Sequence, residues 1–439
     1  MWQSIITFLV NHTPLLYLTQ SLWRDEAFSV WIARDGFAEI IRRTSGDFNP
    51  PLYYIFLHFW MQIFGRSEVA LRSLSVVFFI LFLVATYKFA RTVFKTHYNA
   101  KITTLLMALN PMLLYFAFEL RMYSLLVLLV TSSMYFFYTK QWKWYVLVTT
   151  LGMYTQPFMA FVILAQSLYL LITRCIKQAL INGMSILFLY LPWIPTLLTQ
   201  FRASGPMWMY PVDLITITSV LGNVFFGYEG TPGDLWWLMQ LFSVVFIGII
   251  IWLAKRKQMR PKLLLFVTWI FVPLTTVVLI SLIKPIYVHR YVIFTTVGEV
   301  FLVSFFLQSL PSKKLQTYLK TGIIICLTII NLSVISFHRK VDLQTPFEDI
   351  RTQLQPNDVV YAKTPLVFYE ALYYTPETTR VFLYNPAGIT PPRFVGSVGM
   401  PKEVWAKNYP LFPKRAFVVY EDGTYDVQSV LTKTNALSR

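Results

Sequence analysis

Residues 21–72 read SLWRDEAFSVWIARDGFAEIIRRTSGDFNPPLYYIFLHFWMQIFGRSEVALR, a charged interruption in a chain that is otherwise strongly apolar. The interruption contains the pair Asp25 and Glu26 and, further on, Asp47 with Asn49. A carboxylate beside a lipid bilayer is costly unless it has a partner or a task, so these acids are functional hypotheses. Whether this reasoning applies to the acids depends on whether the surrounding apolar sequence spans a membrane.

The composition of the whole chain predicts an α-helical polytopic membrane protein. Of its 439 residues, 56% are hydrophobic and 13% are charged, and the mean hydropathy is +0.54. Ordinary soluble domains carry about 25% charged residues. Aromatic residues make up 17% of the chain, which is typical of a protein with two interfacial belts.

About eleven apolar runs are expected to cross the membrane as helices, since about 20 apolar residues span a bilayer core. Their ranges are 4–20, 68–94, 101–117, 120–139, 143–155, 157–173, 178–199, 235–254, 262–283, 287–308 and 320–337. The first lacks the basic start and the small-residue cleavage site of a removed signal, so it predicts a membrane helix. The fifth and sixth are short, and one kinked helix around Gln156–Pro157 stays open because proline breaks the helical hydrogen-bond ladder.

The basic residues lie in short connections between the apolar runs and are not gathered on one soluble surface. This distribution excludes a nucleic-acid-binding protein despite the formal net charge of +17. With eleven spans the basic connections share one face, which the positive-inside rule makes cytoplasmic. They contain Lys88, Arg91, Lys95, Lys101, Lys140, Lys143, Arg174, Lys177, Lys255, Arg256, Lys257, Arg260, Lys262, Lys313, Lys314 and Lys320. The loop 21–66 and the residues after about 338 are then extracytoplasmic.

The sequence outside the predicted spans indicates two further kinds of structure. Residues 36–43 and 50–64 are expected to form helices that lie in the membrane interface. Residues 358–362, 380–384 and 416–420 are short apolar runs typical of strands, and LVFYEALYY (366–374) between the first two is helical in pattern. We therefore expect a transmembrane domain over 1–338 and a small extracytoplasmic α/β domain over 339–439.

Several familiar chemistries are missing from the sequence. The chain has no glycine-rich phosphate loop and no HExxH or GxSxG motif. Its two cysteines, Cys175 and Cys326, belong to different parts of the chain and define neither a disulfide framework nor a metal site. No cofactor is predicted, and a requirement for a divalent metal stays open. Nucleotide sugars are cytosolic, and the chain has no loop that would bind a nucleotide. A transferase that acts on the outer face would therefore need a sugar donor that is carried on a lipid.

The pair Asp25–Glu26 is a candidate catalytic site. Transfer of a sugar to a hydroxyl requires a base that takes the hydroxyl proton as the new bond forms, and a carboxylate is a common solution. The structural alternative is that Asp25 pairs with Arg24 or caps the following helix. Asp47 and Asn49, in GDFNPPLYY, could bind the substrate, but Asp and Asn before proline also favour turns.

Two clusters that combine cations with tyrosines are candidates for binding a phosphate. Glu119, Arg121 and Tyr123 belong to one predicted outer hairpin, and His289, Arg290 and Tyr291 to another outer helix end. An arginine can bind a phosphate with two parallel hydrogen bonds. The alternative is that these side chains are interfacial anchors in an aromatic belt. Residues 200–234, rich in aromatics, Gly and Pro, are expected to form an outer loop that contributes to acceptor choice.

Four segments in this order resemble the multi-spanning GT-C glycosyltransferases. They are RDEAFSVWIA (24–33), DFNPPLYYIFLHFWMQIFGRSEVALRSLSVVF (47–78), ELRMYSLL (119–126) and HRYV (289–292). The resemblance is to the bacterial and archaeal relatives of the protein mannosyltransferases, glycosyltransferase family 39, and it covers roughly residues 1–310. It implies a polyprenyl-phosphate sugar donor, reaction on the outer face, and inversion at the anomeric carbon. It also implies Asp25 as the base and places Arg121, Tyr123, Arg290 and Tyr291 near the donor phosphate.

The sequence thus predicts a cell-membrane glycosyltransferase that moves a sugar from a polyprenyl phosphate to a hydroxyl of a lipid, glycan or protein. The chain lacks the large inserted lumenal domain of the eukaryotic protein mannosyltransferases, which puts a protein acceptor in doubt. A transporter or flippase of lipid-linked sugars is one alternative, although its acids would be expected deep within spans. A non-catalytic envelope assembly factor is another. The sugar, the acceptor, the lipid carrier and the oligomeric state are not determined by the sequence.

Overall fold

The structure is a computed structural model that describes residues 10–202, 209, 211–227, 235–256 and 260–431. It divides into two compact units. The helical unit consists of residues 1–18, 72–197 and 209–338, and the mixed unit of residues 19–71, 198–208 and 339–439. The predicted loop 21–66 and the C-terminal residues therefore belong to the same unit.

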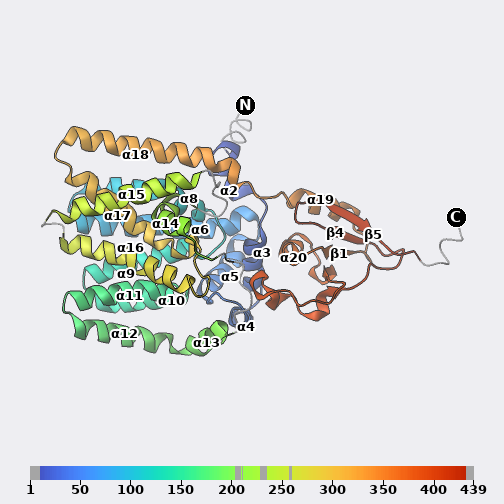
Figure 1. Ribbon diagram of the computed structural model, residues 1–439. Helices are drawn as coiled ribbons and strands as arrows, with labels where there is room; N and C mark the ends of the chain where they lie inside the picture. Colours follow the sequence, from blue (N-terminus) through green and yellow to red (C-terminus); the bar gives the residue numbers. More distant parts are fainter. Residues whose placement is uncertain (1–9, 203–208, 210, 228–234, 257–259, 432–439) are drawn as a thin grey trace. The chain divides into compact units, whose positions relative to one another are not determined.

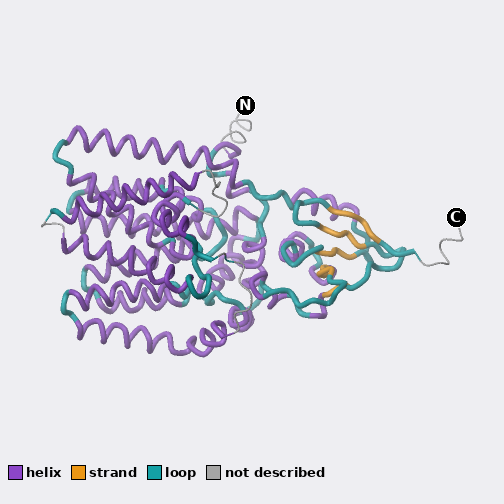
Figure 2. The backbone as a smooth tube through the Cα atoms, in the orientation of Figure 1, coloured by secondary structure: helices purple, strands orange, loops and turns teal. Residues whose placement is uncertain are grey.

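The helical unit is built from long helices that lie side by side, as Figures 1 and 2 show. Its helices, with α2, α6 and α13 shared between the units, are α2 (Leu16–Thr19), α6 (Glu68–Phe94), α7 (His97–Leu109), α8 (Pro111–Ala117), α9 (Tyr123–Tyr138), α10 (Trp142–Met153), α11 (Met159–Ile172), α12 (Ile176–Tyr190), η1 (Leu191–Trp193), α13 (Ile194–Arg202), α14 (Leu214–Phe226), α15 (Trp236–Ala254), α16 (Arg260–Ser281), η4 (His289–Val292), α17 (Phe294–Ser309), α18 (Lys313–Ser333) and η5 (Val334–His338). Apart from 4–20, each predicted span coincides largely with helix. Residues 1–9 of that first span lie outside the described part of the chain.

The number of membrane spans differs from the expected eleven when length and composition are the criteria. Five of the described helices are long and apolar enough to cross a membrane, or six if α7 and α8 form one broken span. These two helices meet at an angle of 66°. The break follows from the sequence, because Asn110 caps α8 through a bond from the Leu113 N–H (3.0 Å) and Pro111 begins the new helix. The count of eleven is therefore not confirmed.

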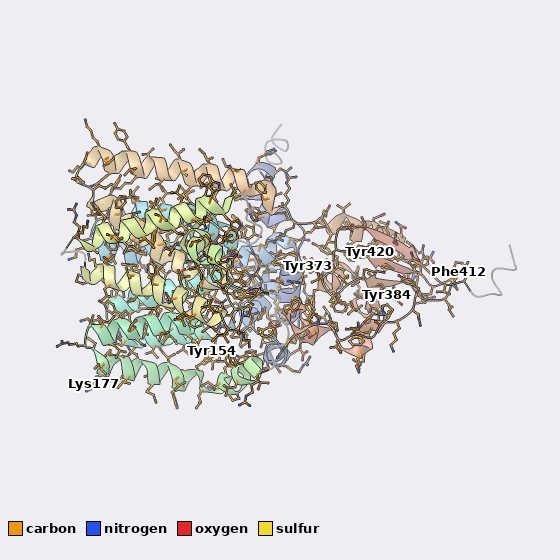
Figure 3. All side chains as sticks on the ribbon, in the orientation of Figure 1. Tyr154, Lys177, Tyr373, Tyr384, Phe412 and Tyr420 are labelled. Carbon is orange, nitrogen blue, oxygen red and sulfur yellow. The ribbon has the colours of Figure 1, made fainter. Side chains whose placement is uncertain are left out.

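The segment 143–173 forms two helices and not one kinked helix. α10 packs against α9 and α12, and α11 packs against α16 and also against α12. Tyr154, which caps the C-terminus of α10, and Lys177, near the start of α12, lie at opposite ends of the helix bundle (Figure 3). Helix α11 thus runs from one end of the helix bundle to the other.

Three helices of the helical unit end on a basic residue with left-handed backbone geometry. These residues are Lys95 after α6, Lys140 after α9 and Arg174 after α11, with φ angles of 61°, 56° and 60°. Glycine usually occupies such a position because a Cβ atom is disfavoured there. A cation at the C-terminus of a helix interacts favourably with the helix dipole. All three belong to the basic connections that the sequence places on the cytoplasmic face.

The expectation that residues 200–234 form a loop was wrong for their central part. Residues 214–226 form helix α14, which begins at Asp213, whose carboxylate accepts a hydrogen bond from the Thr216 N–H (2.7 Å). The helix packs closely on α15, and a Cβ at Gly222 would lie 2.2 Å from the Met239 carbonyl oxygen. Residues 203–208, 210 and 228–234 of this expected loop lie outside the described residues.

The mixed unit combines short helices with a five-stranded sheet. Its helices are α3 (Arg24–Ala33), α4 (Phe37–Gly46), α5 (Leu52–Phe64), α19 (Gln344–Gln353), α20 (Phe368–Tyr374), η6 (Thr378–Arg380), η7 (Arg393–Val395), η8 (Ser397–Gly399) and η9 (Lys402–Val404), and its strands are β1 (Val359–Ala362), β2 (Val381–Tyr384), β3 (Trp405–Ala406), β4 (Ala416–Val419) and β5 (Tyr425–Gln428). The strand order is β3-β2-β1-β4-β5. Only the β4–β5 pair is antiparallel, and Val360 of β1 faces Val381 of β2 and Phe417 of β4. The three predicted strands and the helix between the first two are confirmed.

The predicted loop and the C-terminal residues share one core in the mixed unit. Helix α20 packs on α3, with the Tyr369 ring 4.8 Å from that of Phe28 and 5.4 Å from that of Trp31, measured between centroids. A Cβ at Gly399 would lie 2.4 Å from the Tyr369 hydroxyl and 2.8 Å from the Trp31 ring, so only glycine fits this contact. Such aromatic pairs contribute about 0.5–1.5 kcal/mol each beyond their area of burial. The C-terminal residues thus hold α3 in place.

Candidate functional site

Helix α3 presents Asp25 in its first turn. The helix begins at Arg24, so the carboxylate of Asp25 lies where the helix dipole favours negative charge. Arg24 donates from Nε to Asp25 Oδ1 at 3.2 Å, and the side chain of Asp25 is 16% exposed. The pairing that the sequence left as an alternative is therefore present. It joins two residues that are adjacent in the sequence.

Glu26, the second acid of the pair, is fully buried. Lys340 donates from Nζ to Glu26 Oε2 at 2.8 Å, and the Trp23 backbone N–H lies 3.4 Å from the same oxygen. A buried carboxylate requires such a partner, because an unpaired buried charge is strongly destabilising. Glu26 thereby links the beginning of α3 to the segment that leads into the C-terminal residues.

Asp47 and Asn49 form the turn between α4 and α5. Asp47 is 5% exposed and accepts from the Asn49 side-chain Nδ2 at 3.2 Å and from its backbone N–H at 3.4 Å. Arg393 donates to the preceding carbonyl, that of Gly46, at 2.9 and 3.1 Å. The turn chemistry that the sequence left open is present. The turn is also fixed from outside by a residue of the C-terminal region.

Helix α20 brings two neighbouring side chains close to both acidic positions. Tyr369 interacts electrostatically with Asp47, and Glu370 interacts electrostatically with Asp25 and Arg24. Glu370 is 4% exposed, and its Oε2 has no hydrogen-bond partner among the described residues. The sequence analysis missed Glu370, although an acid inside the apolar run LVFYEALYY is an available signal.

The charge state of Glu370 is expected to make the stability of the protein depend on pH. Burial raises the pKa of Glu370 from its ordinary value of 4.5 to about 8, and Asp25 adds to the increase while Arg24 opposes it. The unfolded chain loses this proton near pH 4.5 and the folded chain near pH 8, so stability falls as the pH rises between these values. The full difference corresponds to about 5 kcal/mol.

We expect Glu370→Gln to remove this dependence. The variant should match the wild type in thermal unfolding temperature near pH 4.5 and exceed it increasingly up to about pH 8, where the difference levels off. Unfolding of the purified protein followed across this range measures the effect. Glu403→Gln, at an exposed glutamate of the same unit, is the matched control. Parallel pH curves for the wild type and Glu370→Gln would contradict the prediction.

The two predicted phosphate-binding clusters come together in the helical unit. Tyr123 interacts electrostatically with Arg290, Arg121, Tyr291 and Glu119, although more than 160 positions separate the two clusters in the sequence. Both arginines are buried inside the protein, with 6% of Arg121 and 4% of Arg290 exposed. A snorkelling arginine keeps its charged end in water. The burial therefore disfavours the reading of these residues as interfacial anchors.

Polar atoms next to these arginines have unused hydrogen-bonding capacity. Within the described residues, the Tyr123 hydroxyl and His289 Nε2 are buried without a hydrogen-bond partner. Buried polar groups are almost always hydrogen-bonded in proteins, so an exception calls for an explanation such as a bound molecule. The Arg290 guanidinium also lies over the Tyr291 ring, 5.6 Å from its centroid. The group has the chemistry to bind an anion that carries a polar substituent.

The unexpected helix α14 supports both clusters. It packs against α8, which precedes the Glu119 hairpin, and against η4, which contains His289 and Arg290. Asn110 donates from Nδ2 to the Phe225 carbonyl at 2.9 Å, and the Thr296 hydroxyl donates to the Val224 carbonyl. The carbonyl groups at the end of α14 are thereby tied to the start of α8 and to α17, the helix that follows η4.

Glu299 is a second acid that the sequence analysis missed. It lies in α17, is fully buried, and neither carboxyl oxygen has a hydrogen-bond partner among the described residues. Its electrostatic neighbour is Tyr287, whose buried hydroxyl likewise has none there. An ionisable residue within a predicted span is a functional hypothesis by itself, so the signal was present in the sequence.

The candidate residues fall into two groups by unit. Asp25, Glu26, Asp47 and Asn49 belong to the mixed unit, and Glu119, Arg121, Tyr123, His289, Arg290 and Tyr291 belong to the helical unit. Within the described part of the chain, no three His, Cys, Asp or Glu side chains gather as metal ligands would.

Comparisons with known proteins relate this chain to membrane glycosyltransferases. Residues 49–198 match the family model described as dolichyl-phosphate-mannose-protein mannosyltransferase. This range includes Asn49, Glu119, Arg121 and Tyr123, and it excludes Asp25 and the His289 cluster. No curated protein matches the sequence.

The fold matches a solved membrane protein over almost the whole chain. The crystal structure of ArnT from Cupriavidus metallidurans in the apo state has a TM-score of 0.62 and 13% sequence identity, with 95% of this chain and 92% of ArnT covered. The structure of the same protein bound to undecaprenyl phosphate matches with the same score and identity over 93% of its chain. The chain thus has the GT-C fold of ArnT, and residues 49–198 carry the sequence pattern of the mannosyltransferase family.

Proposed function

We propose that the chain is a membrane glycosyltransferase that moves a sugar from a polyprenyl-phosphate donor to a hydroxyl acceptor on the extracytoplasmic side. The observation that carries the proposal is the convergence of Arg121 and Arg290 with Tyr123 from two distant segments. A buried pair of arginines beside unsatisfied polar atoms suits a phosphate group. The fold supports it further, since one ArnT structure contains bound undecaprenyl phosphate.

The proposed reaction is a single displacement at the anomeric carbon. Asp25 takes the proton of the acceptor hydroxyl as its oxygen forms a bond to that carbon. The bond between the anomeric carbon and the phosphate oxygen breaks on the opposite side, and polyprenyl phosphate leaves with the bonding electrons. One displacement inverts the configuration at the anomeric carbon, and the proton remains on Asp25 until it passes to water.

The remaining candidate residues bind the donor, support Asp25 or contact the acceptor in this proposal. Arg121 and Arg290 hold the donor phosphate and stabilise the negative charge that grows on it as the bond breaks. Tyr123, Glu119, His289 and Tyr291 complete the surroundings of the donor. Glu26, held by Lys340, keeps the beginning of α3 in position for Asp25. Asp47 and Asn49 shape the turn that contacts the acceptor or the sugar.

The proposal places the enzyme in the cell membrane, with the mixed unit outside the cytoplasm. The basic residues of the helix connections support this orientation through the positive-inside rule. The α11–α12 and α17–α18 connections, which carry Arg174, Lys177, Lys313 and Lys314, lie at one end of the helical unit in Figure 1. The acceptor is a lipid, a glycan or a protein that carries a free hydroxyl.

The rival functions make different use of the same residues. A transporter or flippase of lipid-linked sugars would need the arginine cluster but no base at Asp25. An envelope assembly factor would depend on the C-terminal residues and not on the charges of α3. Only the transferase is expected to cleave the sugar from its lipid carrier, so consumption of the donor distinguishes it from a transporter and from an assembly factor.

The first experiment follows the donor. Purified protein in lipid is supplied with a panel of radiolabelled polyprenyl-phosphate sugars, with crude membranes as the source of acceptor. We expect one donor to lose its label to the acceptor, which establishes the reaction class and identifies the sugar. No consumption of any donor in the presence of membranes would refute the transferase and favour a transporter or an assembly factor.

A further inference from the structure

Glu370 is a buried acid to which the proposed reaction gives no role. It lies in the first turn of α20, is 4% exposed, and its Oε2 has no hydrogen-bond partner among the described residues. A buried carboxylate needs a cation or several hydrogen-bond donors close by, so an acid that lacks them is held in its uncharged form. A buried polar atom without a partner costs stability, and its presence calls for a functional explanation.

The packing of α20 on α3 places Glu370 beside the beginning of α3. Tyr369, the residue before Glu370, packs on Phe28 with the ring centroids 4.8 Å apart. Tyr374, one turn after Glu370, accepts from the Leu22 N–H at 2.9 Å. Residues four positions apart lie on one face of a helix, so Glu370 shares its face of α20 with Tyr374. This face follows the chain from Leu22 into the first turn of α3.

The charges that act most strongly on Glu370 are those of Arg24, Asp25 and Glu421. Arg24 and Asp25 belong to the first turn of α3, and Glu421 follows β4 closely. Arg24 favours the carboxylate form of Glu370, whereas the two acids oppose it. Strands β1 and β2, which also pack against α20, contain no charged residue. Of these three groups Arg24 is the cation, so Glu370 and Asp25 would compete for it.

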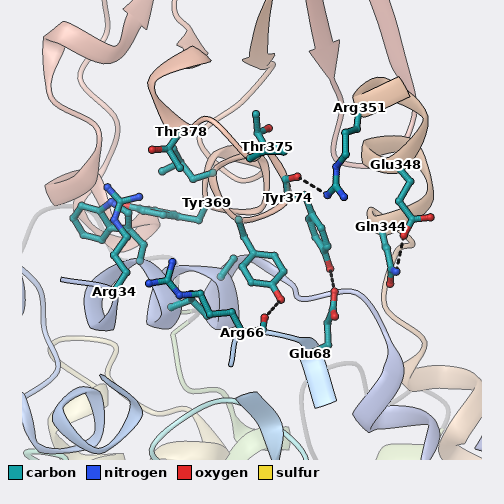
Figure 4. A pocket seen from close by; sticks show the side chains of 16 residues that line it. Arg34, Arg66, Glu68, Gln344, Glu348, Arg351, Tyr369, Tyr374, Thr375 and Thr378 are labelled. Carbon is teal, nitrogen blue, oxygen red and sulfur yellow. Dashed lines mark hydrogen bonds between the residues drawn. The ribbon is translucent and has the colours of Figure 1, made fainter. Parts of the chain in front are cut away.

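Three arginines near α20 line a pocket of about 410 Å³, which Figure 4 shows; they are Arg34, Arg66 and Arg351. The pocket also contains two acids. Glu68 accepts from the Tyr374 hydroxyl at 3.0 Å, and Glu348 of α19 accepts from Gln344 Nε2 at 2.9 Å. Glu370 is not a lining residue of this pocket, and the three arginines are not among the charges that act most strongly on it.

We propose that Glu370 is a positioning residue for the base of the proposed reaction. While its carboxyl is uncharged, Arg24 stays bound to Asp25 at 3.2 Å and holds the Asp25 carboxylate at the start of α3. When Glu370 loses its proton to water, its carboxylate competes for Arg24 and adds a negative charge beside Asp25. Asp25 is then no longer held, and turnover falls. This inference rests on the proposed glycosyltransferase function, because it concerns the base of that reaction.

The ratio of kcat at pH 9 to kcat at pH 7 tests the proposal. Burial raises the pKa of Glu370 to about 8, so its uncharged form becomes about tenfold rarer between these two pH values. Wild-type protein in nanodiscs is supplied with the radiolabelled polyprenyl-phosphate sugar that it consumes and with crude membranes. We expect its kcat to fall about tenfold over this range. Glu370→Gln cannot ionise and should lose less than about twofold. Glu403→Gln, at an exposed glutamate of the same unit, is the control and should fall as the wild type does.

Thermal unfolding gives a second readout that does not depend on turnover. The stability of the wild type is expected to fall with rising pH and to level off above about pH 8. Asp25 raises the pKa of Glu370 and Arg24 lowers it. The pH at which stability levels off should therefore be lower in Asp25→Asn and higher in Arg24→Gln than in the wild type.

The outcomes separate this inference from the function on which it rests. Equal ratios of kcat at pH 9 and pH 7 for the wild type and Glu370→Gln overturn the proposal, because a purely structural Glu370 would change only the unfolding temperature. An unchanged levelling pH in both Asp25→Asn and Arg24→Gln overturns it as well. A protein that consumes no donor refutes the glycosyltransferase function itself, and the unfolding curves then show whether Glu370 is coupled to Arg24 and Asp25 without that reaction.

Discussion

Asp25→Asn is expected to abolish sugar transfer while the protein folds normally. Asparagine has the shape of aspartate but cannot accept a proton from the acceptor hydroxyl, and general base catalysis contributes about 10²–10⁴-fold to a rate. Consumption of the lipid-linked donor should therefore fall at least about a hundredfold. The bond from Arg24 joins adjacent, partly buried side chains, and asparagine keeps an oxygen that can accept it.

The control for this experiment is Asp422→Asn. Asp422 is exposed in the turn between β4 and β5, and its carboxylate bonds only locally, to the N–H and hydroxyl of Thr424, at 3.0 and 2.7 Å. Its replacement should leave turnover unchanged. Thermal unfolding of both variants shows whether the fold is intact. Normal turnover in a folded Asp25→Asn protein would mean that another group is the base.

Replacement of Arg290 is expected to have the second large effect. If Arg290 stabilises the charge on the departing phosphate, Arg290→Ala should lower kcat about 10²–10³-fold, as does the removal of one preorganised donor in other enzymes. Arg290→Lys should recover part of the rate, since lysine keeps the charge but loses the two parallel hydrogen bonds. The effects of Arg121→Ala and Arg290→Ala should not add, because both residues act on one phosphate.

Two further variants distinguish a catalytic role of Arg290 from a loss of protein stability. Arg290 is buried, so Arg290→Lys, which retains the charge, serves as the folded comparison if Arg290→Ala unfolds. Lys177→Ala, near the start of α12, removes an exposed cation and should not alter kcat. A full rate in Arg290→Lys together with additive losses in the double variant would assign the arginines a structural role only.

Local sequence patterns were sufficient for most of the secondary structure. The apolar run 68–94 forms a helix with those bounds, and the runs at 358–362, 380–384 and 416–420 contain β1, β2 and β4. Such elements depend on the apolar character of consecutive residues and on residues such as proline that interrupt it, both of which are visible in the sequence. Helix α14 was missed because the expected loop around it is rich in Gly, Pro and aromatic residues.

Contacts between segments that are far apart in the sequence could not be predicted from local sequence patterns. The sequence identified Arg121 and Arg290 as separate candidates, and only the packing of α8, α14 and η4 brought them to one place. It identified Asp25 and Asp47, but not the helix α20, whose Tyr369 interacts electrostatically with Asp47 and whose Glu370 interacts electrostatically with Asp25. The neighbours of a buried acid depend on how whole helices are positioned. The spacing of residues within one segment contains no information about these positions.

The sequence by itself determined that this protein is a polytopic membrane protein with a charged stretch before the long apolar helix 68–94 and a small α/β region over its last hundred residues. Composition and apolar run length are sufficient for this, because the bilayer imposes a length and a polarity on every segment that crosses it. Only the tertiary structure decided that residues 19–71 and 339–439 form one compact unit and enclose an arginine-lined pocket. The physical reason is that a core forms wherever apolar surfaces fit together, and the fit of Tyr369 between Phe28, Trp31 and Gly399 is a property of three segments at once.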